Sequence, residues 1–193
     1  MPPPAITLPE LTIALTRCAD ASTVFRLTRA DGSVTWQRTR GATGAFFPGH
    51  DLTHYAVETV LGHTRGFYGL VADGWDLDSF AAPWPRGRLV DIDPSELIVG
   101  FVLNTGLDRS GLADGTEADA GALNAAAMTF FASPRTDPAS AARWRDLGNA
   151  QLAAVRTRAR VLVSAWDALP AGGTLTLRFD RLAFDRAVAR QPG

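Results

Sequence analysis

Residues 23–38 read TVFRLTRADGSVTWQR and place Asp31-Gly32 between two β-prone runs. An Asp-Gly pair in this setting is a strong hairpin signal, because glycine adopts a positive φ at little cost. The two runs are therefore predicted to form antiparallel strands over 23–28 and 33–38. Their alternating apolar residues are expected to supply the buried face, namely Phe25, Leu27, Val34 and Trp36.

The segments on either side of this hairpin also have strand patterns. Leu11, Ile13 and Leu15 alternate with Thr12, Ala14 and Thr16, as in a half-buried strand. Residues 173–180 (GTLTLRFD) alternate in the same way near the end of the sequence. The sequence thus predicts a meander over 1–40 and a C-terminal strand that returns to it.

The region between these strands, 50–169, is expected to be mainly helical. The first helix is predicted over 50–62 and ends at Gly62, since glycine suits a helix C-terminus. Asp93-Pro94 is a helix-start signal, with Asp93 as the cap and Glu96 reaching back to the cap amide. Further helices are predicted over 117–132 and from Asp137-Pro138 to Leu169. The fold class is α+β, a small antiparallel sheet packed by four or five helices in a single domain, 1–193.

An apolar stripe follows one face of the last predicted helix. Its members are spaced 3, 4, 3, 4 and 3 residues apart: Leu152, Val155, Ala159, Leu162, Trp166 and Leu169. The stripe is short for a coiled coil, so packing on the sheet is favoured. Burial against a second copy, in a homo-dimer, is the alternative.

Composition limits the classes of function. The chain is 46% apolar and 20% charged, which suits a globular core, and no apolar run approaches the length of a membrane span. A net charge of −1 argues against nucleic-acid binding. The N-terminal residues do not resemble a secretory signal, so we expect a cytoplasmic protein with no membrane partner. The 19 basic residues are all arginine, which we interpret as GC-rich coding bias in a bacterial gene.

Several catalytic motifs are missing from the sequence. A phosphate-binding loop needs a lysine, and the chain contains none. It also lacks the glycine fingerprint of dinucleotide-binding folds and the nucleophile elbow of α/β-hydrolases. The single cysteine, Cys18, excludes an intramolecular disulfide and leaves a catalytic thiol as a minor hypothesis.

The chemistry-bearing residues gather in one short segment. His50, His54 and His63 are the only histidines, with Asp51 and Glu58 among them. Positions four apart share one helix face, and neutral imidazoles so placed are ready ligands for Zn²⁺ or a similar ion. His50 and Glu58 would be about 12 Å apart along a helix, at 1.5 Å per residue, so one ion could scarcely use both.

The expected metal ligands are therefore two of His50, His54 and Glu58, completed by a residue from further along the chain. Candidates for the missing ligand are His63 and the aspartates Asp73, Asp76 and Asp78. Glu58 or Asp51 is the candidate catalytic base. The ordinary alternative makes Asp51 a helix N-cap, His54 and Glu58 a hydrogen-bonded pair, and His63 a residue near a helix C-terminus.

The stretch His50–His54 (HDLTH) resembles the zincin helix motif, His-Glu-x-x-His. The resemblance covers these five residues, and Asp51 stands where the motif has its catalytic glutamate. Because aspartate is one methylene shorter, we interpret the likeness as shared local geometry and not as membership of that family.

Three functions remain open from the sequence. The first is a metal-binding protein that uses a divalent ion such as zinc, with hydrolysis of a small-molecule or peptide substrate as the candidate activity. The second is a non-catalytic ligand-binding or interaction module with structural histidines, self-associating through 152–169. The third is a metal-free acid–base enzyme at the same cluster.

Overall fold

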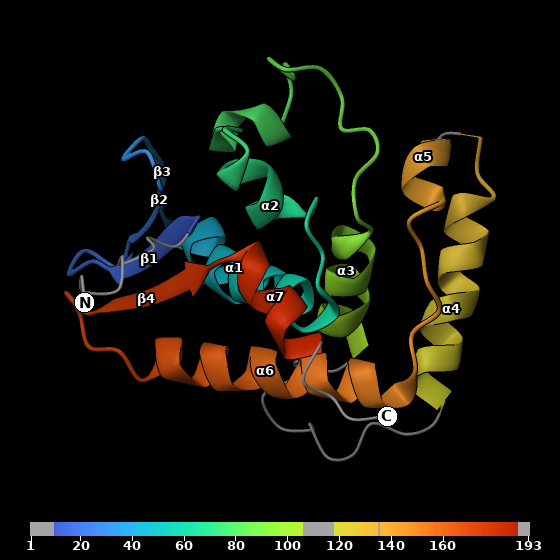
Figure 1. The fold of residues 1–193 in the computed structure, drawn as a ribbon. Helices are drawn as coiled ribbons and strands as arrows, with labels where there is room; N and C mark the ends of the chain where they lie inside the picture. The colour runs from blue at the N-terminus through green and yellow to red at the C-terminus, as the bar shows by residue number, and fades with distance from the viewer. Residues whose placement is uncertain (1–9, 106–117, 135, 189–193) are drawn as a thin grey trace, which may run out of the picture.

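A four-stranded antiparallel sheet forms one side of the molecule (Figure 1). The structure is a computed structural model that describes residues 10–105, 118–134 and 136–188. The strands lie in the order β3-β2-β1-β4. Their bounds are β1 Leu11–Arg17, β2 Thr23–Arg29, β3 Val34–Thr39 and β4 Thr174–Phe179. The predicted meander and the returning C-terminal strand are both confirmed, and β4 pairs with β1.

The register of β3 corrects one part of the predicted buried face. Thr35 stands opposite the buried Leu27, whereas Trp36 stands opposite Arg26 on the outer face and is 59% exposed. Val34 is only half-buried. The three-residue turn Ala30–Gly32, with Gly32 at a φ of 86°, sets this register, and successive side chains then alternate between faces.

Helix α1 (Gly41–Leu61) starts nine residues before the predicted first turn. Its glycines and Pro48 obscured this in the sequence, since proline inside a helix removes one backbone hydrogen bond. The carbonyl group left without that donor belongs to Gly44, and the Thr23 hydroxyl of β2 donates to it at 3.2 Å. The sheet thereby supplies what Pro48 removes. Gly62, at a φ of 71°, ends the helix as predicted.

The remaining helices are arranged around α1, some against the sheet and some at the far end of the molecule (Figure 1). Helices α4 and α5 lie at the end opposite the sheet, and the long α6 runs beneath the sheet and α1. The bounds are α2 Phe67–Ala72, the 3₁₀ turn η1 Leu77–Phe80, α3 Ser95–Thr105, α4 Ala118–Phe131, α5 Pro138–Ala141, α6 Asn149–Asp167 and α7 Arg181–Val188. Among the described residues, no helix has the length and apolarity needed to cross a membrane.

The helix predicted from Asp137 to Leu169 is divided in two. Asp137 does cap a helix, because its side chain accepts from the amides of Ala139 and Ser140. That helix, α5, ends at Ala141, and α6 begins only at Asn149. The cap signal was therefore correct, but it belonged to a separate short helix.

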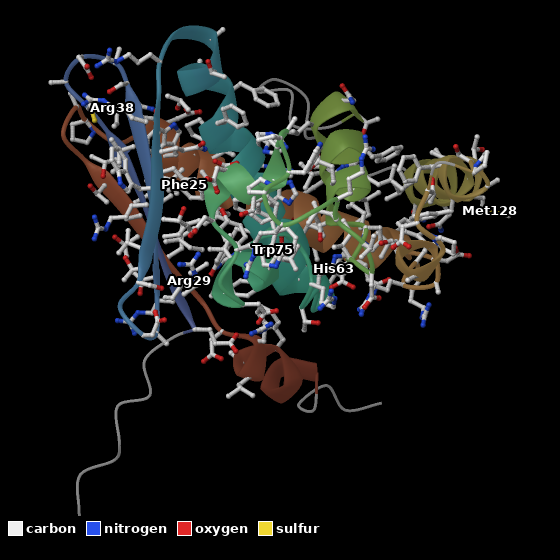
Figure 2. All side chains as sticks on the ribbon, turned by 90° about the horizontal axis from the view of Figure 1, so that it is seen from above. Phe25, Arg29, Arg38, His63, Trp75 and Met128 are labelled. Atoms are coloured by element: carbon white, nitrogen blue, oxygen red, sulfur yellow. The ribbon has the colours of Figure 1, made fainter. Side chains whose placement is uncertain are left out.

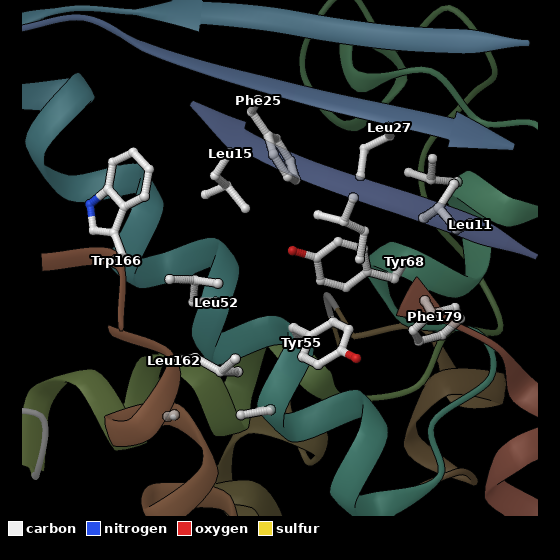
Figure 3. Packing of buried hydrophobic residues seen from close by; sticks show 14 residues of the cluster. Leu11, Leu15, Phe25, Leu27, Leu52, Tyr55, Tyr68, Leu162, Trp166 and Phe179 are labelled. Carbon is white, nitrogen blue, oxygen red and sulfur yellow. The ribbon is translucent and has the colours of Figure 1, made fainter. Parts of the chain in front are cut away.

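The main core lies between the inner face of the sheet and helices α1, α2 and α6 (Figure 3). Leu15, Phe25 and Leu27 from the sheet face Leu52 of α1 and Tyr68 of α2. The stripe residues on α6, from Leu152 to Trp166, are buried against α1 and the core of the same chain. Leu169 follows the end of the helix and is half-buried. This stripe therefore packs on the protein's own core.

The register makes a prediction about stability. Leu27→Ala should lower the free energy of unfolding by about 2–5 kcal/mol, because it opens a cavity under the sheet. The matched control Trp36→Ala should change it by less than about 0.5 kcal/mol, because this larger side chain lies on the outer face. Urea unfolding of both variants measures the difference, and a larger loss for Trp36→Ala would show that the register is wrong.

Candidate metal centre

Two histidines of α1 and one glutamate of α3 converge on a single point. His50 and His54 are one helical turn apart, and their ring centroids are 4.7 Å apart. The Glu96 carboxylate lies 3.6 Å from His50 Nε2 and 2.8 Å from His54 Nε2. One ligand atom from each of the three lies within 4.8 Å of the others. This group could therefore hold a metal ion.

The opposite nitrogen of each imidazole faces a buried carboxylate. Asp51 Oδ1 lies 3.2 Å from His50 Nδ1, and Glu58 Oε1 lies 3.5 Å from His54 Nδ1. Both carboxylates are nearly or wholly buried. A carboxylate behind the second nitrogen is the usual partner of a metal-ligating histidine, because it fixes the tautomer and the ring orientation.

Glu58 is held by backbone as well as by His54. Its Oε2 accepts from the amides of Tyr68 at 3.0 Å and Gly69 at 3.4 Å, in the first turn of α2. The other oxygen, Oε1, and His54 Nδ1 make no hydrogen bond, although they face each other. A small movement of either side chain would join them.

The charges in the cluster shift one another. Burial opposes protonation of His54, but the Glu58 and Glu96 carboxylates outweigh it and raise its pKa to about 9. Burial raises the pKa of Glu58, even though His54 opposes this. Hydrogen bonds from His50 and His54 hold the pKa of Glu96 well below its usual range. The two acidic side chains on either side of His54 therefore favour a positive charge on its ring.

Asp93 positions Glu96 beside the histidines. It was predicted to cap its own helix, α3, but its side chain binds amides of another segment instead. Its Oδ2 accepts from the amides of Thr64 and Arg65, at 2.8 and 2.7 Å. This carboxylate thus ties the turn after α1 to the beginning of α3. Glu96 bonds to His54 and not to the cap amide, so the capping-box expectation was wrong.

The structure separates the other candidate ligands from this group. His63, labelled in Figure 2, is not part of the converging group. Its Nδ1 lies 2.8 Å from Ser95 Oγ. Asp73 pairs with Arg181, and Asp76 pairs with Arg29 of β2. Asp78 lies on η1 and does not belong to the converging group.

Asp51 and Glu58, the two acidic residues of α1, do not have the roles first expected of them. Asp51 lies in the middle of α1, so the N-cap alternative for it was wrong. Glu58 stands behind His54 and is no member of the converging group. Of the residues named from the sequence, the structure brings His50 and His54 together, with Asp51 and Glu58 behind them.

Glu96 is the residue that the sequence pattern missed. It stands 42 positions after His54, and its place in a helix-start motif gave it a local explanation. The one available signal was that glutamate is rare in this chain, which has only four. The contact depends on how the 62–93 segment folds back, which no spacing rule describes.

The converging group opens on a pocket of about 610 Å³. His50, His54 and Glu96 line one part of it, and Asp51 also reaches the wall. The Glu96 side chain is 72% exposed, whereas that of His54 is 6% exposed. A ligand at this point would thus be held from a buried side and approached from an open one.

Comparisons with known proteins give no relative for this chain. No protein-family model matches it, and searches of curated proteins and solved structures return no significant match. The donor set is two imidazole nitrogens and a carboxylate, which is a ligand set of catalytic zinc sites and of non-haem iron sites.

Gly66 provides a test of how tightly the cluster is built. A Cβ at this position would collide with the Glu58 carboxyl carbon and lie 2.6 Å from Ser95 Oγ. Gly66→Ala should therefore destabilise the protein by about 1–3 kcal/mol. The control Gly49→Ala lies in α1 beside His50, meets nothing within 4 Å, and should stabilise by about 0.5–1 kcal/mol. Thermal and urea unfolding measure both, and equal effects would contradict the close approach.

Proposed function

We propose that this protein binds one divalent metal ion through His50, His54 and Glu96, with zinc as the first candidate. The observation that carries the proposal is the orientation of both imidazoles. Each directs Nε2 toward Glu96 and Nδ1 toward its own carboxylate. A single ion among the three donors would satisfy both rings at once, as metal-binding histidines require.

The charge balance supports a cation at this point. Glu58 and Glu96 together favour a positive charge on His54. An incoming ion would take the place of the His54 proton, since only neutral imidazole can be a ligand. Metal binding should then release a proton near neutral pH.

Asp51 and Glu58 act in this proposal as positioning residues. Glu58 has no exposed surface and two amide partners, so it has no free approach to a substrate. Asp51 is 6% exposed and contacts His50. Each would hold one histidine in the tautomer that leaves Nε2 free to bind.

Metal-dependent hydrolysis is the reaction class that this arrangement favours. Three protein ligands leave a coordination position open, which distinguishes catalytic from structural zinc sites. When bound, such an ion supplies Lewis acidity, polarising a carbonyl group and making water a stronger nucleophile at neutral pH. The pocket beside Glu96 would hold the substrate.

Metal analysis tests the proposal directly. Protein purified without an affinity tag should contain near-stoichiometric metal, and chelator-treated protein should take up one equivalent of Zn²⁺, Mn²⁺ or Fe²⁺. His54→Ala should lose this uptake, whereas His63→Gln should retain it because His63 lies outside the group. Wild-type protein that takes up no ion, with chelator-insensitive activity, would instead favour the metal-free acid–base function.

The positioning role of Asp51 gives a second prediction. Asp51→Asn should weaken metal affinity about 10–100-fold while leaving all three ligands in place. The control Asp78→Asn, on η1, should leave the affinity unchanged. Competition with a chromogenic chelator measures both affinities. Equal affinities for wild type and Asp51→Asn would show that Asp51 does not orient His50.

A further inference from the structure

The pocket beside the metal group, meaning His50, His54 and Glu96, has a mainly apolar wall with several aromatic rings. Phe67 lies 5.7 Å from the His54 ring and 4.8 Å from Phe80, measured between centroids. Phe47 approaches the His50 ring at 6.0 Å. The wall is completed by aliphatic side chains and one further ring: Leu70, Leu77, Leu89, Ile92 and Phe130. A surface of this kind accommodates an apolar body with a ring system.

Each positively charged side chain on the pocket wall is paired with a carboxylate. Arg65 is the one arginine among the described residues that line the pocket. Its Nε donates to the Asp91 carbonyl at 2.6 Å and lies 3.6 Å from the Asp91 carboxylate. His50 and His54 also line the pocket, but their rings are already paired with the carboxylates of Asp51, Glu58 and Glu96. An anion in the pocket would therefore find no unpaired cation among the described lining residues.

Gln37 adds a neutral polar group to the pocket wall. It lies in β3 opposite Phe25, so the pleat directs it to the inner face of the sheet, and it lines the pocket. An amide can both donate and accept a hydrogen bond without adding charge. A few polar groups in an apolar wall are what orient a small ligand.

We propose that this pocket takes an uncharged small molecule with an aromatic ring system. Its rings would lie among Phe67, Phe80 and Leu77, and its polar group would be within reach of Gln37 or the metal group. The pocket volume of about 610 Å³ is in the range of small-molecule sites. As a substrate class, this inference rests on the proposed metal function, but ring binding itself requires no ion.

A matched pair of fluorescent probes tests the inference on metal-free protein. N-phenyl-1-naphthylamine is uncharged, and 1-anilinonaphthalene-8-sulfonate has the same ring system with one negative charge. The neutral probe should bind with 1:1 stoichiometry and a blue-shifted emission, and the sulfonate should bind at least about tenfold more weakly. Failure of the neutral probe to bind, or equal binding of both probes, would overturn the proposal.

Cavity-filling variants assign the probe to this pocket. Leu77→Trp should reduce affinity for the neutral probe at least about tenfold, and Leu89→Trp provides a second filling variant should the first fold poorly. The control Val161→Trp places the same ring on the exposed face of α6 and should not change it. Binding unaffected by either filling variant would place the probe elsewhere and contradict the inference.

Metal uptake by the same variants separates the two proposals. Both filling variants should still take up one equivalent of Zn²⁺, because neither residue is a ligand. Probe binding without metal uptake in the wild type would contradict the proposed function alone. Metal uptake without probe binding would contradict the ring-binding inference alone.

Discussion

The site depends on the burial of one carboxylate. Glu58 has no exposed surface, and a buried carboxylate is costly unless it is paired and hydrogen-bonded. It obtains two amides from the first turn of α2, which fixes the chain that leads from α1 into α2. Gly66 permits this approach, since any side chain there would occupy the same space. The remaining oxygen faces His54, so the constraint that shapes the turn also orients an imidazole.

The two halves of the site are held in different ways. His54 lies in α1, which is buried among the sheet, α3 and α6, and its position follows from the core. Glu96 is exposed and depends on the attachment of the start of α3 to the turn after α1. Asp93 provides this attachment and is itself 3.4 Å from Arg143, beyond α5. The histidine nitrogens of α1 are therefore fixed by the core, whereas the Glu96 carboxylate that they face lies on a more exposed segment.

The sequence predicted those features that depend on neighbouring residues. The Asp31-Gly32 hairpin, the Gly62 helix end and the one-turn spacing of His50 and His54 all depend on local geometry. The early start of α1 was missed because the Gly44 carbonyl, which Pro48 leaves without a donor, accepts a hydrogen bond from Thr23 of β2. Glu96 was missed for the same reason, since its partner is 42 residues away. Local rules could not describe either contact, because the tertiary fold creates both.

The arrangement of the cluster is more readily explained by ligand binding than by stability. Buried ion networks seldom stabilise a fold more than well-packed apolar residues of similar volume. A stabilising role would account for Glu58 on its two amides, but it requires neither the convergence of two Nε2 atoms nor an open pocket beside them. A role in holding a cation accounts for these features together. The positive charge that the carboxylates now favour on His54 would then be supplied by the ion.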